Sequence, residues 1–178
     1  EDFSEALGLN PDQPLIHYDR GRAYAGQGEY QRAVEDFNQA IRLDNSRADF
    51  YYQRGAALSA QQNYLEAIED FSQALELDPQ NSAAFNQRGL AYAAQQEFEP
   101  ALENFNQAIR LDSTQADFYF NRGNAFADQP AHKCGRAIED YNQAIALDED
   151  QAPYYYRRGL AYFMNDELPS ALEDFERA

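Results

Sequence analysis

The sequence is organised around a glycine that returns at a nearly constant interval. Successive members of this series lie 34, 34, 34 and 36 residues apart, and each follows an arginine. An alanine, an aromatic residue and a second alanine come after each glycine at a closely similar step. A constant interval of this length is typical of a repeat protein in which each repeat forms one supersecondary unit. The glycines are Gly21, Gly55, Gly89, Gly123 and Gly159.

The clearest unit runs from 48 to 81 and contains two amphipathic patterns. Its first half places apolar or small residues, from Phe50 to Leu58, at helical spacing and ends in a polar run. Its second half keeps this spacing around Phe71 and ends just before Pro79. Apolar residues at this period indicate a helix with one buried face, and proline stops a helix because it has no amide hydrogen to donate. The unit therefore predicts a helix, a short turn and a second helix.

The recurring glycine lies inside the first predicted helix, where it is unfavourable by about 1 kcal/mol relative to alanine. Alanines recur on the apolar face of the second predicted helix. Small residues in both helices are explained if the two backbones approach each other closely. The pattern therefore predicts that the glycine faces the second helix of its own unit.

The spacing of Gly89, Tyr92, Ala101, Phe105 and Ala108 resembles that of the tetratricopeptide repeat, a helix-turn-helix of 34 residues. The resemblance covers nearly the whole chain. It implies an all-α fold, a right-handed superhelical α-solenoid of antiparallel helix pairs that forms one continuous domain. Repeats are expected at 14–47, 48–81, 82–115, 116–151 and 152–178, the fourth with a two-residue insertion and the fifth truncated, after the tail of a preceding second helix at 1–13.

Composition agrees with this expectation. The chain has 178 residues, 44% of them hydrophobic, and no apolar stretch long enough to span a bilayer, which favours a soluble protein without membrane insertion. It starts at Glu1 rather than at a methionine, which suggests a fragment or a processed chain. The sequence does not determine the cellular compartment of the protein, although it slightly favours the cytoplasm. A single cysteine, Cys134, excludes an internal disulfide framework.

The net charge of −17 comes from 31 acidic and 14 basic residues, and only one of the basic residues is a lysine. Binding of nucleic acid requires clustered lysine and arginine, so nucleic acid is a poor partner. Much of the acidic charge recurs in the second helices, which largely form the convex face in the family. We interpret it as a solvated face, and the alternative is an acidic docking surface.

The arginine before each glycine has an expected partner in the second helix. An aspartate or an asparagine stands just before each recurring aromatic residue of that helix. We expect a ladder of arginine–aspartate pairs that joins the two helices of a repeat, or adjacent repeats. The arginines are Arg20, Arg54, Arg88, Arg122 and Arg158, and the facing residues are Asp36, Asp70, Asn104, Asp140 and Asp174.

In the family, the first helices form most of the concave wall, at the second, fifth, sixth, ninth and twelfth positions of each repeat. Here the fifth, sixth and ninth columns give a wall that is rich in aromatic and amide side chains. Aromatic rings supply contact area at low entropic cost, and amides pair with the backbone of an extended peptide. We therefore expect a groove that binds a peptide or helical segment of a partner protein; alternatively, the rings only fill gaps between repeats. The groove residues are Tyr18, Arg22, Tyr52, Gln53, Asn86, Gln87, Leu90, Phe120, Asn121, Asn124, Tyr156, Arg157 and Leu160.

Family members that act as chaperone cofactors grip a C-terminal carboxylate with lysines and asparagines of the groove. The fifth column has no lysine here, and the second column includes Asp49 and Asp117. The C-terminal tail of a heat-shock chaperone is therefore disfavoured as a partner. The amides of Gln53, Gln87 and Asn121 are more similar to the grooves of members that hold extended peptides through the backbone.

The insertion of the fourth repeat lies in the segment 128–136, which contains His132 and Cys134. Two ligands fall short of a tetrahedral metal site, and no base is spaced to activate the thiol. We expect no metal, cofactor or catalysis here, and interpret the segment as an extended turn or, alternatively, as a loop that contacts a partner.

These patterns favour a protein-interaction scaffold over an enzyme, because the sequence has no phosphate-binding loop, metal motif or nucleophile elbow. The partner stays unidentified. The alternative function is a self-associating structural or assembly-factor solenoid whose uncapped terminal helices pack end to end. That packing would use Phe3 and Leu7 at one end, or Leu172 and Phe175 at the other.

Overall fold

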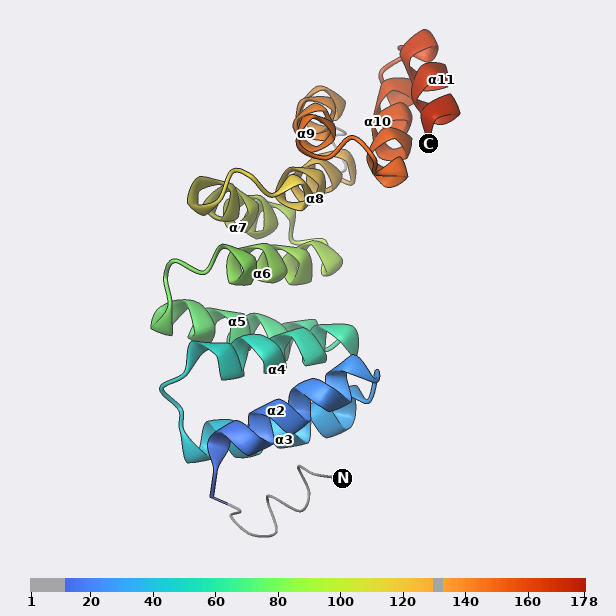
Figure 1. Cartoon of the computed structure of the whole chain (residues 1–178). Coiled ribbons are helices and arrows are strands. Elements are labelled where there is room, and N and C mark those ends of the chain that lie inside the picture. Colours follow the sequence, from blue (N-terminus) through green and yellow to red (C-terminus); the bar gives the residue numbers. More distant parts are fainter. Residues whose placement is uncertain (1–11, 130–132) are drawn as a thin grey trace. The chain divides into compact units, whose positions relative to one another are not determined.

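A computed structural model describes residues 12–129 and 133–178. The tail of a preceding repeat, predicted for 1–13, lies almost wholly outside these residues. Within the described residues all regular secondary structure is helical (Figure 1). The helices are α2 (Pro14–Gly26), α3 (Tyr30–Leu43), α4 (Ala48–Ala60), α5 (Tyr64–Leu77), α6 (Ser82–Ala94), α7 (Phe98–Leu111), α8 (Ala116–Ala127), α9 (Cys134–Leu147), α10 (Ala152–Met164) and α11 (Leu168–Arg177).

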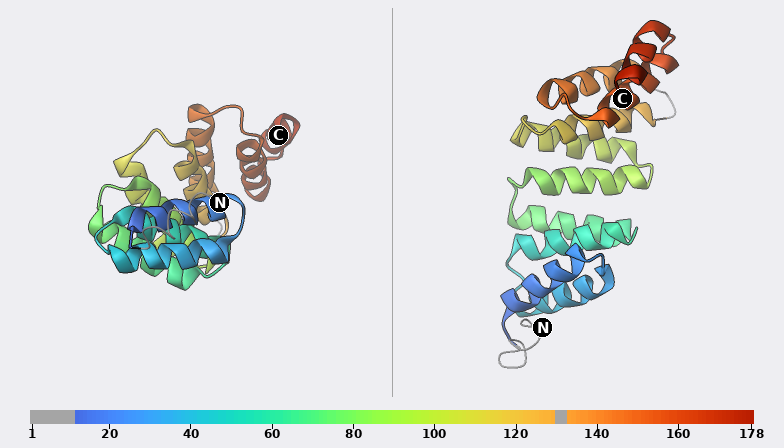
Figure 2. Two further views of the ribbon diagram at one scale, coloured as in Figure 1. Left: turned by 60° about the horizontal axis from the view of Figure 1, so that its bottom comes forward. Right: turned by 45° about the vertical axis from the view of Figure 1, so that its right-hand side comes forward.

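Consecutive helices pack as antiparallel pairs. The pairs α2 with α3, α4 with α5, α8 with α9, and α10 with α11 lie side by side in every view (Figures 1 and 2). The first helices α2, α4, α6, α8 and α10 begin at the residues where the repeats are expected to begin. The prediction of an all-α solenoid of helix pairs is confirmed. The right-handed superhelix concerns how successive parts of the chain are placed, and it stays a prediction.

The chain forms two compact units, which we describe separately. Unit 1 comprises residues 1–91 and unit 2 comprises residues 92–178, so the division falls inside α6. In unit 1, α3 packs against α4 of the following repeat. In unit 2, α7 packs against α8 and α9 against α10. No helix in the described parts of either unit has the length and apolar character needed to cross a membrane.

In four of the repeats the glycine of the first helix lies against the aromatic ring of the second helix. A methyl group built on Gly55 would lie 3.0 Å from Cε1 of Phe71, and one on Gly159 would lie 2.7 Å from Cε1 of Phe175. Gly21 and Gly123 show the same close approach to Phe37 and Tyr141 respectively. The predicted contact between the glycine column and the second helix is confirmed at these positions. The ring occupies the space that any larger side chain would need.

The core of each repeat is built from the recurring alanine and aromatic columns. Phe37, Phe71, Phe105 and Tyr141 are each 0% exposed. The alanines that flank them on the second helices are also fully or almost fully buried. Small residues on one helix therefore receive large rings from the other, which gives interdigitated packing without bulky side chains on both faces.

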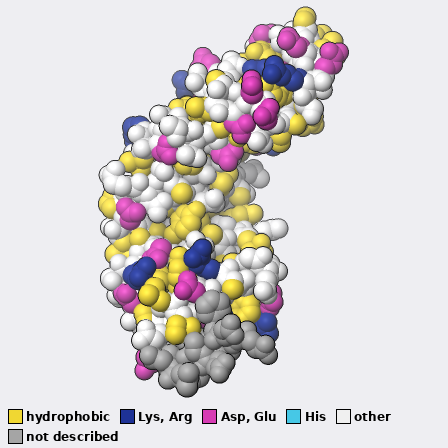
Figure 3. All heavy atoms as spheres, viewed as in Figure 1, with side chains coloured by type: hydrophobic (Ala, Val, Ile, Leu, Met, Phe, Trp, Pro, Cys, Tyr) yellow, Lys and Arg dark blue, Asp and Glu magenta, His cyan; other side chains and the backbone are white. Residues whose placement is uncertain are grey.

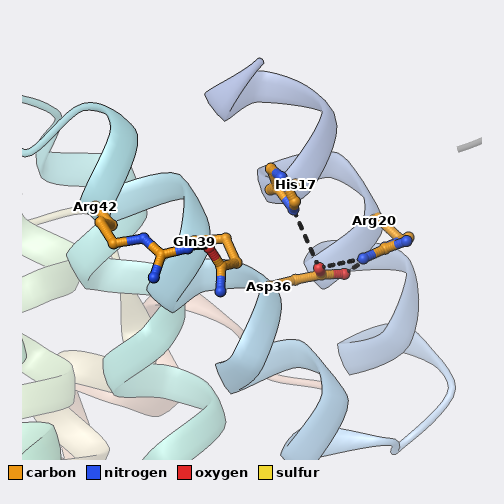
Figure 4. Close-up of polar contacts among 5 residues, drawn as sticks. All are labelled: His17, Arg20, Asp36, Gln39 and Arg42. Atoms are coloured by element: carbon orange, nitrogen blue, oxygen red, sulfur yellow. Dashed lines mark hydrogen bonds and ion pairs between the residues drawn. The ribbon is translucent and has the colours of Figure 1, made fainter. Parts of the chain in front are cut away.

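The predicted arginine–aspartate ladder is present in four of the five repeats. In the first repeat, Nε and Nη2 of Arg20 donate to the two carboxylate oxygens of Asp36, each at 2.7 Å. His17 also points at Asp36, with Nδ1 3.4 Å from Oδ1 (Figure 4). The two-point geometry joins α2 to α3 with both partners charged, which makes strong, well-oriented hydrogen bonds. Equivalent pairs join Arg54 to Asp70, Arg122 to Asp140 and Arg158 to Asp174.

The same arginines also connect neighbouring repeats, a link that we did not assign to specific residues from the sequence. Nη1 of Arg54 donates to Oδ1 of Asn38 at 2.6 Å, and Nη1 of Arg158 donates to Oδ1 of Asn142, also at 2.6 Å. The acceptor is always the residue after the buried aromatic ring of the preceding repeat. The remaining pairs of this kind are Arg88 with Ser72 and Arg122 with Asn106.

The third repeat has Asn104 where the other repeats have the aspartate of the ladder. Its amide donates to the backbone oxygen of Pro100 at 2.8 Å, within α7. In the second and fourth repeats, burial raises the pKa of the Asp70 and Asp140 carboxyls, and the hydrogen bonds from their arginines oppose that shift. The ladder is therefore a structural device inside the four repeats that have it, because its carboxylates are buried.

Candidate functional site

The contacts between helices identify the inner side of each unit. The first helices of neighbouring repeats approach each other, since α2 and α4, and likewise α8 and α10, have Cα atoms within 8 Å. The second helices α3 and α5 have no Cα atoms within 8 Å of each other, and the same holds for α9 and α11. A stack of hairpins that is tighter on one side curves toward that side. In each unit, therefore, the first helices lie on the inner side.

In α2, the two expected groove residues differ in exposure. Tyr18 is half-buried, with its ring centroid 4.9 Å from that of Phe50 in the next repeat and 6.0 Å from that of Phe37 in its own. Burial, with a contribution from the Asp49 carboxylate, raises the pKa of the Tyr18 phenol. Arg22 is exposed and lies over the Tyr18 ring, with Cζ 5.6 Å from the centroid. Tyr18 thus fills a gap between repeats, whereas Arg22 is open to a ligand.

In α4 and α6, the residues of the amide column are partly accessible. The Tyr52 ring packs on Phe71 at 5.9 Å, and burial raises the pKa of its phenol. Gln53 and Gln87 are half-buried at equivalent positions of the two helices. Asn86 is buried, at 6% exposed, and Leu90 is 36% exposed. The accessible residues of this wall in unit 1 are therefore Arg22, Gln53, Gln87 and Leu90, with part of Tyr52.

In α8, one expected groove residue has an internal role. The Tyr141 hydroxyl donates to Oδ1 of Asn124 at 2.9 Å. Tyr141 is the one tyrosine in an aromatic column that is otherwise phenylalanine, and Asn124 is the one asparagine of its own column. Both unusual residues occur in the same repeat, and this coincidence was the feature of the sequence that pointed to the hydrogen bond between them.

The ring and the amide beside Asn124 are partly accessible. The Phe120 ring lies between Tyr141, at 5.8 Å, and Tyr154 of the next repeat, at 4.7 Å. Phe120 and Asn121 are both half-buried. As with Tyr18, the aromatic ring of this column packs between two repeats. The alternative interpretation of the aromatic column therefore describes Tyr18 and Phe120 well.

In α10, the expected groove residues are more open. Tyr156 is 53% exposed, with its ring 6.0 Å from that of Phe175. Leu160 and Arg157 are half-buried, and Nη1 of Arg157 lies 3.6 Å from Oδ1 of Asp128. This ion pair connects α10 to the residue that follows the end of α8.

The insertion offers no assembled site in its described part. Cys134 is buried at the start of α9, and His132 lies outside the described residues. Among the residues described, no three histidine, cysteine or acidic side chains are grouped so that they could hold a metal ion. On the face shown in Figure 3, the acidic side chains are scattered among uncharged and basic ones.

Comparison with protein families assigns these hairpins to a family. A model described as "Tetratricopeptide repeat" matches residues 1–48 and 18–82, and one described as "TPR repeat" matches residues 89–129 and 133–166. The chain belongs to the tetratricopeptide repeat family. Its repeats are thus of a kind that serves as a scaffold for protein interactions. No curated protein matches the chain.

Solved structures share this tetratricopeptide repeat fold at low identity. MamA from Desulfovibrio magneticus RS-1 is 20% identical, with a TM-score of 0.84 over 92% of this chain and 92% of that one. YrrB, described as a TPR protein with an unusual peptide-binding site, is 22% identical, with a TM-score of 0.78 over 99% and 90%. PilF of Pseudomonas aeruginosa is 18% identical, with a TM-score of 0.82 over 99% and 77%. At these identities the likeness concerns the fold and does not identify a ligand.

Proposed function

We propose that this tetratricopeptide repeat protein is an interaction scaffold that binds an extended peptide segment of a partner protein on the inner side of unit 1. The observation that carries the proposal is the approach of α2 to α4 on one side only, which puts the first helices on the inner side. Gln53 and Gln87 stand at the same column of successive first helices. A scaffold function requires no catalytic residue, and we assign none.

The accessible wall residues suit a peptide backbone with apolar side chains. Each glutamine amide offers one acceptor and two donors, so it can pair with both polar groups of an extended peptide unit. Leu90 and the accessible part of Tyr52 supply apolar surface beside these amides. Arg22, exposed and over the Tyr18 ring, supplies a cation at the α2 end of the wall. The expected ligand is therefore an extended peptide with apolar side chains and one acidic group.

The first test of this proposal is a loss of affinity when both amides are removed. A library of short linear peptides is screened against the purified chain, and the tightest peptide is titrated by isothermal calorimetry. The double variant Gln53→Ala/Gln87→Ala should bind this peptide about tenfold more weakly or worse, because two hydrogen bonds contribute about 1 kcal/mol each.

The matched control removes two other glutamines of similar burial. Gln73 on α5 and Gln107 on α7 are half-buried but belong to second helices. The variant Gln73→Ala/Gln107→Ala should keep the wild-type affinity. If both double variants bind the peptide as tightly as wild type, the inner wall of unit 1 is not the binding surface.

A further inference from the structure

A hollow of about 320 Å³ lies between α3, α4 and α5 of unit 1, and we call it the α3–α5 hollow. None of the expected groove residues lines it, so it is separate from the inner wall. Its apolar lining consists of Leu58, which is buried, and Val34, which is half-buried. Its polar lining consists of Asn38, Arg54, Glu66, Glu69 and Asp70.

The charges of the α3–α5 hollow are unequal. Arg54 and Asp70 compensate each other, because Nε and Nη2 of the arginine donate to the two carboxylate oxygens at 2.7 and 2.6 Å. Glu66 and Glu69 are exposed and lie one turn apart on α5. Within the described part of the chain, neither of these two glutamates takes part in a hydrogen bond or an ion pair. The hollow therefore has two carboxylates without a cation of their own.

Two other repeats place an arginine of the chain at the position of Glu66. In the fourth repeat this residue is Arg136, and its Cζ lies 5.6 Å from the centroid of the Phe126 ring. Phe126 is the equivalent of Leu58. The corresponding pair of the first repeat is Arg32 over Tyr24, at 5.3 Å. A guanidinium beside the apolar residue of this column is thus an arrangement that the repeat accommodates.

In the second repeat the ligand has to supply this cation. A fitting group needs an apolar part to cover Leu58 and a positive head to reach Glu66 and Glu69. An arginine side chain has both, since its methylene groups pack on apolar surface and its guanidinium donates hydrogen bonds to carboxylates. A metal ion has no apolar part, and no three acidic, histidine or cysteine side chains among the described residues are grouped to hold one. The net charge of −17 also favours encounter with a basic segment.

We propose that the α3–α5 hollow binds an arginine side chain of a partner protein. The methylene groups of this arginine pack on Leu58 and Val34, and its guanidinium donates to Glu66 and Glu69. The site gives the protein a preference for partners that present an exposed arginine. It is a second binding site, which neither requires nor follows from peptide binding on the inner wall.

The probe for this proposal is a short blocked peptide with one arginine between two leucines. Its neutral counterpart has citrulline in place of arginine, which keeps the shape of the side chain and removes its charge. Methyl signals of Leu58 and Val34 in the ¹³C-labelled full chain are followed by nuclear magnetic resonance as each peptide is added. The arginine peptide should shift these signals to saturation and bind at least about fivefold more tightly than the citrulline peptide, as expected for two exposed ion pairs.

A pair of charge-matched variants locates the site. Glu66→Gln/Glu69→Gln should weaken binding of the arginine peptide to the level of the citrulline peptide. Glu35→Gln/Glu103→Gln is the control, because these exposed residues of α3 and α7 are the equivalents of Glu69 and their replacement changes the net charge by the same amount. This control should bind the arginine peptide like wild type. Circular dichroism checks that each variant keeps the helix content of wild type.

Three results would overturn the proposal. One is equal binding of the arginine and citrulline peptides, and another is equal binding by Glu66→Gln/Glu69→Gln and the control variant, because net charge would then explain the attraction. The third is loss of the methyl shifts in Gln53→Ala/Gln87→Ala, because the peptide would then occupy the inner wall. The proposed peptide site is tested by a different ligand and different residues, so failure here leaves it unchanged.

Discussion

Replacing Phe71 by alanine should lower the free energy of unfolding by about 3–5 kcal/mol, the usual cost of emptying a fully buried phenylalanine site. Phe71 is 0% exposed and contacts both the glycine and the tyrosine of its own first helix. Its removal empties the contact between α4 and α5 beside Gly55. Because a repeat is stable only against its neighbours, the loss should also weaken the packing of unit 1.

The measurement is denaturation by guanidinium chloride, followed by far-ultraviolet circular dichroism. Leu65→Ala on the same helix is the control, because Leu65 is 68% exposed and its loss should change stability by less than about 0.5 kcal/mol. Equal stability losses in Phe71→Ala and Leu65→Ala would contradict the assignment of the aromatic column to the core.

Replacing Asp140 by alanine should cost about 3 kcal/mol. The carboxylate is buried and receives two hydrogen bonds from Arg122, at 2.6 and 2.8 Å. Removal of one partner of a buried pair leaves the other charge without compensation, which typically costs about 3–5 kcal/mol. We expect the lower end of that range because 22% of the Arg122 side chain is still exposed to solvent.

Two further variants separate charge from shape at this site. Asp140→Asn should lose less stability than Asp140→Ala, because the amide oxygen still accepts from the guanidinium. Glu139→Ala alters the exposed neighbour and should be nearly neutral. If Asp140→Ala is no more destabilised in urea than Glu139→Ala, the ladder does not stabilise the repeat.

Much of the fold was predictable because the residues that make each contact recur in successive repeats. The glycine and aromatic columns of Gly55 and Phe71 recur at one step, so a contact inferred in one repeat is expected in the others. The pairing of Arg54 with Asp70 follows from the same columns. The link from Arg54 to Asn38 was missed, although its acceptor column also recurs after each aromatic residue. A guanidinium can donate hydrogen bonds to two partners at once, and the sequence alone does not show which residue of the neighbouring repeat is the second partner.

The candidate site was less predictable because accessibility depends on the neighbouring repeat. Tyr18 and Tyr156 occupy the same column, yet Tyr18 is half-buried under Phe50 and Tyr156 is 53% exposed. Asn124 was expected to face a ligand, but its side chain accepts from the Tyr141 hydroxyl. The position of a residue in the repeat predicts which face of the helix it lies on. How much of its side chain is accessible to a partner depends on the residues of the next repeat.

The most direct test of the proposed function is to map the contacts of the bound library peptide by nuclear magnetic resonance. Backbone and side-chain amide signals of the ¹⁵N-labelled chain are followed as the peptide is added. We predict the largest shifts for the side-chain amides of Gln53 and Gln87 and for the backbone of α4 and α6. Shifts confined to the second helices α3 and α5, or to α10 and α11, would contradict the assignment of peptide binding to the inner wall of unit 1.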